Sequence, residues 1–225
     1  MSDMIEFGAN DRRATGYLAL PERGEGPGVL VLHAWWGLND FFKDLAERLA
    51  GEGFVAFAPD LYDGRTASQI EDAEELIRTL DAREAIHYET GAADYLLEHP
   101  AVRGRRIGVV GFSMGAAYGT WLATLRREVA AVVMFYGGVE QEEGFARETT
   151  AAFLGHFAER DEYESQEVMR RLEAELRSAG REAAFYVYPS TRHWFFEDDR
   201  PDAYDPDAAG IAWQLTVDFL RDKLG

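Results

Sequence analysis

The chain has 225 residues, of which 47% are hydrophobic and 13% aromatic, enough for a large buried core and suited to one domain over residues 1–225. Its formal net charge of -18 argues against nucleic acid and anionic membrane surfaces as partners, because both would repel it. The absence of cysteine excludes disulfide bonds, thiolate metal sites and a cysteine nucleophile.

The chain starts with Met1-Ser2-Asp3, without the basic and apolar regions of a signal peptide. No apolar run approaches the roughly 20 residues of a membrane span, so we expect a soluble, cytoplasmic protein. Residues 5–7 and 17–20 flank a polar turn at Asn10 and Asp11, which predicts an antiparallel hairpin at a sheet edge.

Short apolar runs then alternate with longer helical stretches along the rest of the chain. The runs have the composition of strands buried on both faces, and they cover residues 29–32, 55–58, 107–110, 130–136, 151–154 and 183–188. The helical stretches cover residues 41–50, 69–80 continuing to 97, 116–125, 164–179 and 208–224. This alternation predicts an α/β fold, with a mostly parallel central sheet and helices on both faces.

The strongest chemical motif is Gly-Phe-Ser-Met-Gly at residues 111–115, directly after one apolar run and directly before a predicted helix. A serine in such a strand–turn–helix junction projects above the sheet from a strained turn, and the flanking glycines avoid backbone clashes. The helix N-terminus favours negative charge developing beside it. We therefore interpret Ser113 as a nucleophile, the alternative being an incidental serine in a glycine-rich turn.

A serine hydroxyl needs a base within hydrogen-bond reach, and histidine is the usual choice. In the fold for which this motif is typical, the chain order is serine, acid, histidine. Only His156 and His193 follow the serine. His193 lies in a loop between the last predicted strand and the last helix, where the base is expected, whereas His156 ends an apolar strand and fits a structural role better.

The acid must lie between the nucleophile and the base, after the preceding strand, where it orients the imidazole. Asp161 fits best, since it follows the strand at 151–154 and precedes the helix at 164–179. Glu159 and Glu162 are rivals, and Asp161 could instead only cap that helix. The oxyanion hole needs two backbone N–H donors, for which we assign Met114 and Trp35, the latter in the loop after residues 29–32.

Together these motifs resemble the dienelactone hydrolase family of α/β-hydrolases, over about residues 5–224. The resemblance is carried by residues 28–39, by Ala-Pro-Asp-Leu-Tyr at 58–62, by residues 111–115, and by His193-Trp194-Phe195 with Arg200-Pro201 behind it. It implies the α/β-hydrolase fold, and it gives Ser113, His193 and Asp161 the roles of nucleophile, base and acid.

Three positions depart from the founding members of that family. Those enzymes use a cysteine nucleophile where this chain has Ser113, and an oxyanion-loop glutamate where it has Ala34. The arginine with which those enzymes bind the substrate carboxylate falls at about position 197, where this chain has Glu197. Each change removes a feature tied to an anionic dienelactone, so we expect a different, neutral or weakly polar substrate.

These residues predict a serine hydrolase of small carboxylic esters or lactones that works through an acyl-enzyme. An acyltransferase with the same triad and a non-catalytic receptor for small ligands are the alternatives. The chain has no metal or nucleotide motif, so we expect no metal and no cofactor. The substrate pocket is expected to be apolar, with these aromatic residues as candidates beside their alternative role in the core: Trp36, Tyr62, Phe112, Tyr136, Trp194 and Phe195.

Overall fold

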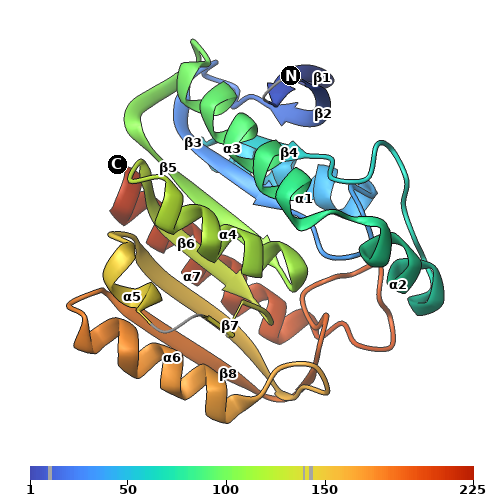
Figure 1. The fold of residues 1–225 in the computed structure, drawn as a ribbon, viewed down its shortest axis with the longest axis vertical. Coiled ribbons are helices and arrows are strands. Elements are labelled where there is room, and N and C mark those ends of the chain that lie inside the picture. The colour runs from blue at the N-terminus through green and yellow to red at the C-terminus, as the bar shows by residue number, and fades with distance from the viewer. Residues whose placement is uncertain (10–11, 139, 142–143) are drawn as a thin grey trace.

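The computed structural model describes residues 1–9, 12–138, 140–141 and 144–225. Its strands form one eight-stranded sheet in the order β1-β2-β4-β3-β5-β6-β7-β8 (Figure 1). β1 pairs antiparallel with β2, β2 pairs antiparallel with β4, and the other neighbours are parallel. The bounds are β1 Ser2–Ala9, β2 Arg12–Ala19, β3 Gly26–Leu32, β4 Val55–Pro59, β5 Val102–Phe112, β6 Val129–Phe135, β7 Ala152–Arg160 and β8 Ala183–Arg192.

The predicted α/β fold and the N-terminal hairpin are confirmed, with β1 at one edge of the sheet. The predicted turn at Asn10 and Asp11 lies outside the described residues. Within a central strand, side chains alternate between the two faces of the sheet. In β3, for example, Val29 and Val31 join one buried cluster, whereas Leu30 and Leu32 join the other.

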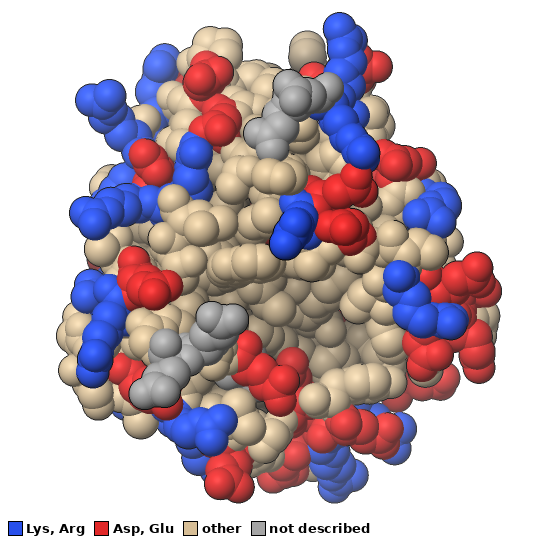
Figure 2. Space-filling model, viewed as in Figure 1, with Lys and Arg blue, Asp and Glu red and all other residues tan. Residues whose placement is uncertain are grey.

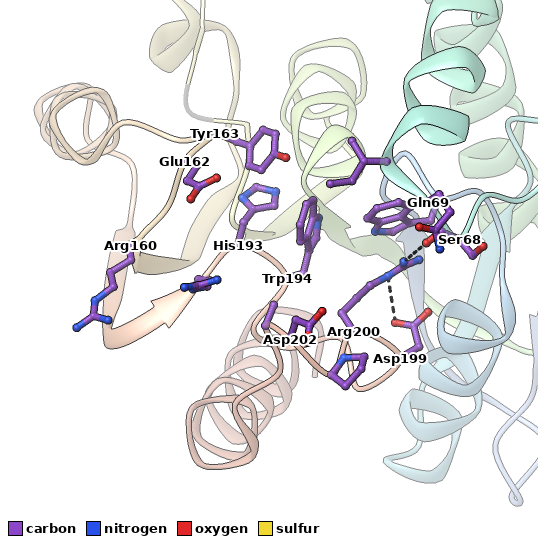
Figure 3. Close-up of a pocket in the computed structure, with 15 residues that line it drawn as sticks. Ser68, Gln69, Arg160, Glu162, Tyr163, His193, Trp194, Asp199, Arg200 and Asp202 are labelled. Carbon is purple, nitrogen blue, oxygen red and sulfur yellow. Dashed lines mark hydrogen bonds and ion pairs between the residues drawn. The ribbon is translucent and has the colours of Figure 1, made fainter.

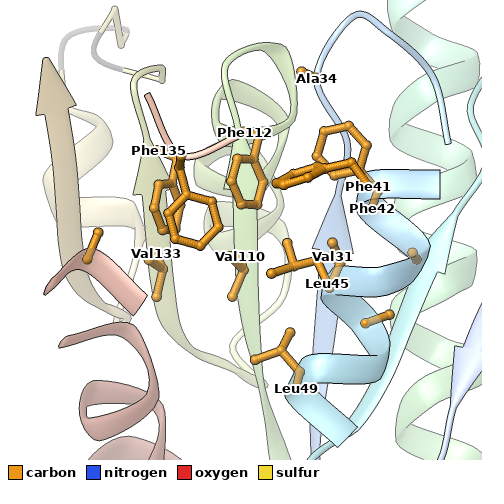
Figure 4. Close-up of a cluster of buried hydrophobic side chains, with 14 of the residues drawn as sticks. Val31, Ala34, Phe41, Phe42, Leu45, Leu49, Val110, Phe112, Val133 and Phe135 are labelled. Carbon is orange, nitrogen blue, oxygen red and sulfur yellow. The ribbon is translucent and has the colours of Figure 1, made fainter. Parts of the chain in front are cut away.

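Each cluster is closed by its own helices, so the sheet is covered on both faces. One cluster packs the sheet against α1 and α7; Phe41 and Phe42 of α1 pack edge-to-face against Phe112, which stacks on Phe135 (Figure 4). The other packs it against α3, α4 and α6, which lie in front of the sheet in Figure 1. The bounds are α1 Asp40–Gly51, α2 Ile70–Thr79, α3 Ala82–Glu98, α4 Met114–Leu125, α5 Phe145–Glu148, α6 Gln166–Ser178 and α7 Pro206–Leu224.

The predicted continuous helix from residue 69 to residue 97 is wrong, because the chain forms two helices there, α2 and α3. Leu80 is extended, with ψ 117°. Asp81 then caps α3, its carboxylate accepting from the N–H groups of Arg83 at 2.7 Å and Glu84 at 3.1 Å. An aspartate that caps a new helix ends the preceding one even where the apolar period continues.

The carboxyl ends of the parallel strands all lie at the same end of the sheet. The loops after β5, β7 and β8 meet there. Acidic side chains and the side chains of lysine or arginine are interspersed on the face seen in Figure 2. Among the described residues, none of the helices combines the length and apolar character that a membrane crossing needs.

Candidate active site

Ser113 occupies the turn between β5 and α4, with φ 49° and ψ -111°. A non-glycine residue with positive φ is strained, and such strain concentrates at functional sites. The turn fits only because its neighbours lack side chains: a Cβ on Gly111 would meet the Gly115 carbonyl oxygen at 2.5 Å. A Cβ on Gly137, after β6, would collide with the Ser113 backbone, so the turn also requires this glycine, which was not predicted from the sequence.

Ser113, His193 and Asp161 form one hydrogen-bonded chain, drawn from three separate loops. His193 Nε2 lies 3.1 Å from the Ser113 hydroxyl oxygen. His193 Nδ1 lies 2.9 Å from each carboxylate oxygen of Asp161. The His193 and Asp161 side chains are only 4% and 3% exposed. With its proton on Nδ1 and donated to Asp161, the imidazole is free to accept the serine proton at Nε2.

Asp161 belongs to the hydrogen-bonded chain with His193 and does not cap α6. Its Oδ1 accepts from the N–H groups of Tyr163 at 2.9 Å and Glu164 at 3.0 Å, which fixes the loop before the helix. Ser165 caps α6 instead. Of the two rivals, Glu159 accepts from the Ser190 N–H at 2.8 Å and Glu162 lines a cavity beside His193.

A second buried carboxyl group, that of Glu197, is linked to the surroundings of the imidazole by Tyr136. The Tyr136 ring centroid is 4.9 Å from that of His193, and the Tyr136 hydroxyl donates to Glu197 Oε1 at 2.7 Å. Glu197 is completely buried, and burial raises the pKa of its carboxyl group to about 8. Glu197 was identified from the sequence only as the residue near the position of the family's arginine, and its pairing with Tyr136 was not predicted.

One of the two expected oxyanion donors is at the start of α4, and the other is in the loop after β3. Met114 is the first residue of α4, and within the described ranges neither its N–H nor that of Trp35 has a hydrogen-bond acceptor. Buried His33 fixes the Trp35 loop: its Nδ1 lies 2.7 Å from the Ala34 carbonyl oxygen, and its Nε2 accepts from the Leu61 N–H. His33 precedes Ser113 in the chain and so was not a candidate for the base, and its role in holding this loop was not predicted.

A cavity of about 550 Å³ opens beside His193. Figure 3 shows Trp194 in its wall, between His193 and Arg200. Of the six aromatic residues predicted for the pocket, Trp36 and Trp194 line this cavity. The other four do not line it, and their side chains are fully buried in the core: Tyr62, Phe112, Tyr136 and Phe195.

The cavity is also lined by residues that were not predicted from the sequence to belong to the site. Arg160 and Arg192 line the cavity from the ends of β7 and β8, and Tyr163 lines it from the loop after β7. Residues 68–70, which lead into α2, line it as well. His156 lies elsewhere, buried between the Tyr188 and Thr216 hydroxyl groups. In the described part of the chain, no three acidic or histidine side chains are grouped closely enough to hold a metal ion.

Comparisons with known proteins place the chain in a family. The model of the "Dienelactone hydrolase family" matches residues 14–224. The chain is 34% identical to "Protein usf" of Aquifex pyrophilus, over all of both chains. It is 30% identical to the "Probable 2-oxo-3-(5-oxofuran-2-ylidene)propanoate lactonase" of Bradyrhizobium sp, over 97% of this chain and 93% of that one.

Among solved structures, the fold is similar to that of a dienelactone hydrolase-like promiscuous phosphotriesterase from metagenomic libraries. The TM-score is 0.90 at 24% identity, over 100% of this chain and 99% of that chain. That likeness concerns the fold, whereas the family model and the relatives concern the sequence. The chain belongs to the dienelactone hydrolase family of α/β-hydrolases and is a hydrolase of the carboxylic ester and lactone class.

Proposed function

We propose that this protein hydrolyses small carboxylic esters or lactones through a covalent intermediate on Ser113. The observation that carries the proposal is the hydrogen-bonded chain from Ser113 through His193 to Asp161. Acyl transfer to water needs a nucleophile, a base in contact with it and a group that orients the base. The family membership supports the same reaction class.

In the first half of the reaction, His193 Nε2 accepts the hydroxyl proton of Ser113 while its oxygen attacks the carbonyl carbon. The negative charge on the carbonyl oxygen is stabilised by the N–H groups of Met114 and Trp35. Asp161 stabilises the imidazolium ion. When the bond to the leaving oxygen breaks, His193 returns its proton to that oxygen, and the acyl group stays on Ser113.

In the second half, His193 accepts a proton from water, and the resulting hydroxide attacks the acyl carbon. The bond to Ser113 breaks, the serine oxygen regains the proton from His193, and the carboxylic acid leaves. Neither half needs a metal or a cofactor. The serine nucleophile and the alanine at position 34 support esters without a carboxylate as substrates.

The test is hydrolysis of p-nitrophenyl acetate, butyrate and octanoate by the wild type, Ser113→Ala and Ser178→Ala. Ser178, at the end of α6, is the matched control, because it lies outside the site. We expect turnover in the wild type and the control, and only background in Ser113→Ala with an unchanged circular dichroism spectrum. Full activity of folded Ser113→Ala would contradict the proposal.

A further inference from the structure

The cavity beside the site contacts the base but not the nucleophile. His193 lines it, whereas Ser113, Met114 and Trp35, all described residues, do not. In the hydrolysis proposed above, on which this inference rests, His193 must reach the leaving oxygen to protonate it. The alcohol half of the ester therefore lies on the side of His193. We propose that this cavity binds the alcohol half of the substrate and selects esters of aromatic alcohols.

Two aromatic rings and an isoleucine side chain form the wall next to the base. Tyr163 is 51% exposed, and its ring centroid lies 4.8 Å from that of His193 and 5.3 Å from that of Trp194. Ile70, 40% exposed, lines the same cavity. Aromatic rings bind other aromatic rings through stacked or edge-to-face contacts at such separations. A planar group leaving with its oxygen near His193 meets these faces.

The backbone places Trp194 in this wall at a conformational cost. Trp194 has φ 66°, a left-handed conformation that bulky side chains rarely adopt. The side chain is held by its neighbours, with ring centroids 5.3 Å from Trp36 and 5.1 Å from His193. Strain of this kind persists where surrounding contacts fix it, often at ligand sites. The loop thus puts a large flat surface between the base and the rest of the cavity.

The charges around the cavity favour a neutral occupant over an ionic one. Three arginines are matched by three acids among the lining residues: Arg160, Arg192, Arg200, Glu162, Asp199 and Asp202. Arg200 is further engaged, with its guanidinium 3.6 Å from the Trp36 ring centroid and 3.7 Å from an Asp199 oxygen. A volume of about 550 Å³ lies within the usual range for small-molecule sites and exceeds what methanol or ethanol would fill.

The experiment compares two isomeric esters, 2-phenylethyl acetate and ethyl phenylacetate, with ethyl acetate as the baseline. Both isomers release a primary alcohol and carry one phenyl ring, on the alcohol half in the first and on the acyl half in the second. We expect kcat/KM for 2-phenylethyl acetate to exceed that for ethyl phenylacetate by about tenfold or more. Equal values, or a preference for ethyl phenylacetate, would overturn the assignment of the cavity while leaving ester hydrolysis intact. No turnover of any of the three esters by folded protein would overturn both proposals.

Trp194→Leu tests the aromatic wall, and Trp121→Leu is its matched control. Trp121 lies on α4, is 43% exposed and does not line the cavity. Trp194→Leu is expected to reduce the ratio between the two isomers by about tenfold, whereas Trp121→Leu leaves it unchanged. The ratio is the decisive readout, because a disturbance of His193 alone would slow both isomers equally. A wild-type ratio in Trp194→Leu would overturn the proposal.

Discussion

The two buried carboxyl groups near His193 differ in how many hydrogen-bond donors surround them. Asp161 accepts from the N–H groups of Tyr163 and Glu164 as well as from His193. Glu197 accepts from the Tyr136 hydroxyl, and its Oε2 has no partner among the described residues. A carboxylate needs donors when it loses water. The loop at Asp161 is therefore built to hold a negative charge beside the imidazole, whereas the surroundings of Glu197 favour its neutral form.

The largest effect is expected when the charge at Asp161 is removed. In Asp161→Asn the side chain keeps its size but no longer stabilises the imidazolium ion, so kcat/KM for an ester should fall by about a thousandfold or more. His193→Ala should lower it further, because the base itself is gone. Steady-state kinetics on p-nitrophenyl acetate measure both. Wild-type kcat/KM in Asp161→Asn would show that another group orients His193.

Tyr136→Phe tests the other carboxyl group by removing its hydrogen-bond donor. A buried acceptor left without a partner costs about 1–3 kcal/mol, so the free energy of unfolding should fall by that amount. The loss should be larger at pH 9 than at pH 6, because Glu197 is then ionised in the folded protein. Urea unfolding at both pH values measures it. An equal loss at the two values would contradict a titrating Glu197.

Glu197→Gln tests the same group through its proton. The pKa of Glu197 is raised from its ordinary 4.5 to about 8, so its contribution to stability is full below about pH 4.5 and is lost as pH rises through 8. Glutamine does not titrate. Between pH 5 and 8 the variant should therefore gain stability relative to the wild type, by up to about 1.4 kcal/mol per pH unit. Parallel stability profiles of the two proteins would contradict the raised pKa.

The smallest effect is expected when the cap of α6 is removed. This change tests whether the cap contributes to stability without affecting the role of Asp161 in the site. Ser165 caps α6 by accepting from the Val168 N–H at 3.4 Å. Ser165→Ala should lower the free energy of unfolding by about 1 kcal/mol, with kcat/KM within about twofold of the wild type. Thermal unfolding and ester kinetics measure the two quantities. A large loss of activity would mean that the loop at Asp161 depends on this cap.

The sheet was predictable because each strand can be recognised from its own local sequence. Each is a short apolar run bounded by turn residues, so the runs around Leu30 and Val109 could be read without knowing their partners. The break between α2 and α3 was not readable, since the apolar period continues through it and only the cap at Asp81 ends the first helix. The four-residue α5 is too short to show a period.

Part of the candidate site could likewise be predicted from the sequence, and part of it could not. The order of Ser113, Asp161 and His193 along the chain, and the loops that carry them, could be deduced from motifs. The cavity could not, because its walls combine residues 68–70, 160, 162–163, 192–194 and 199–203, which only the fold brings together. Phe112 and Tyr136 looked available from their positions at strand ends, yet their side chains enter the core, since face selection depends on register.

The most direct measurement of the central claim is covalent labelling of the wild type with a fluorophosphonate, followed by intact mass and peptide mapping. An activated serine attacks this reagent as it attacks an ester. We predict a single adduct on Ser113, formed far more slowly in folded His193→Ala and absent in Ser113→Ala. An adduct on another residue, or equal labelling of Ser113 in His193→Ala, would contradict the assignment of Ser113 as a nucleophile activated by His193.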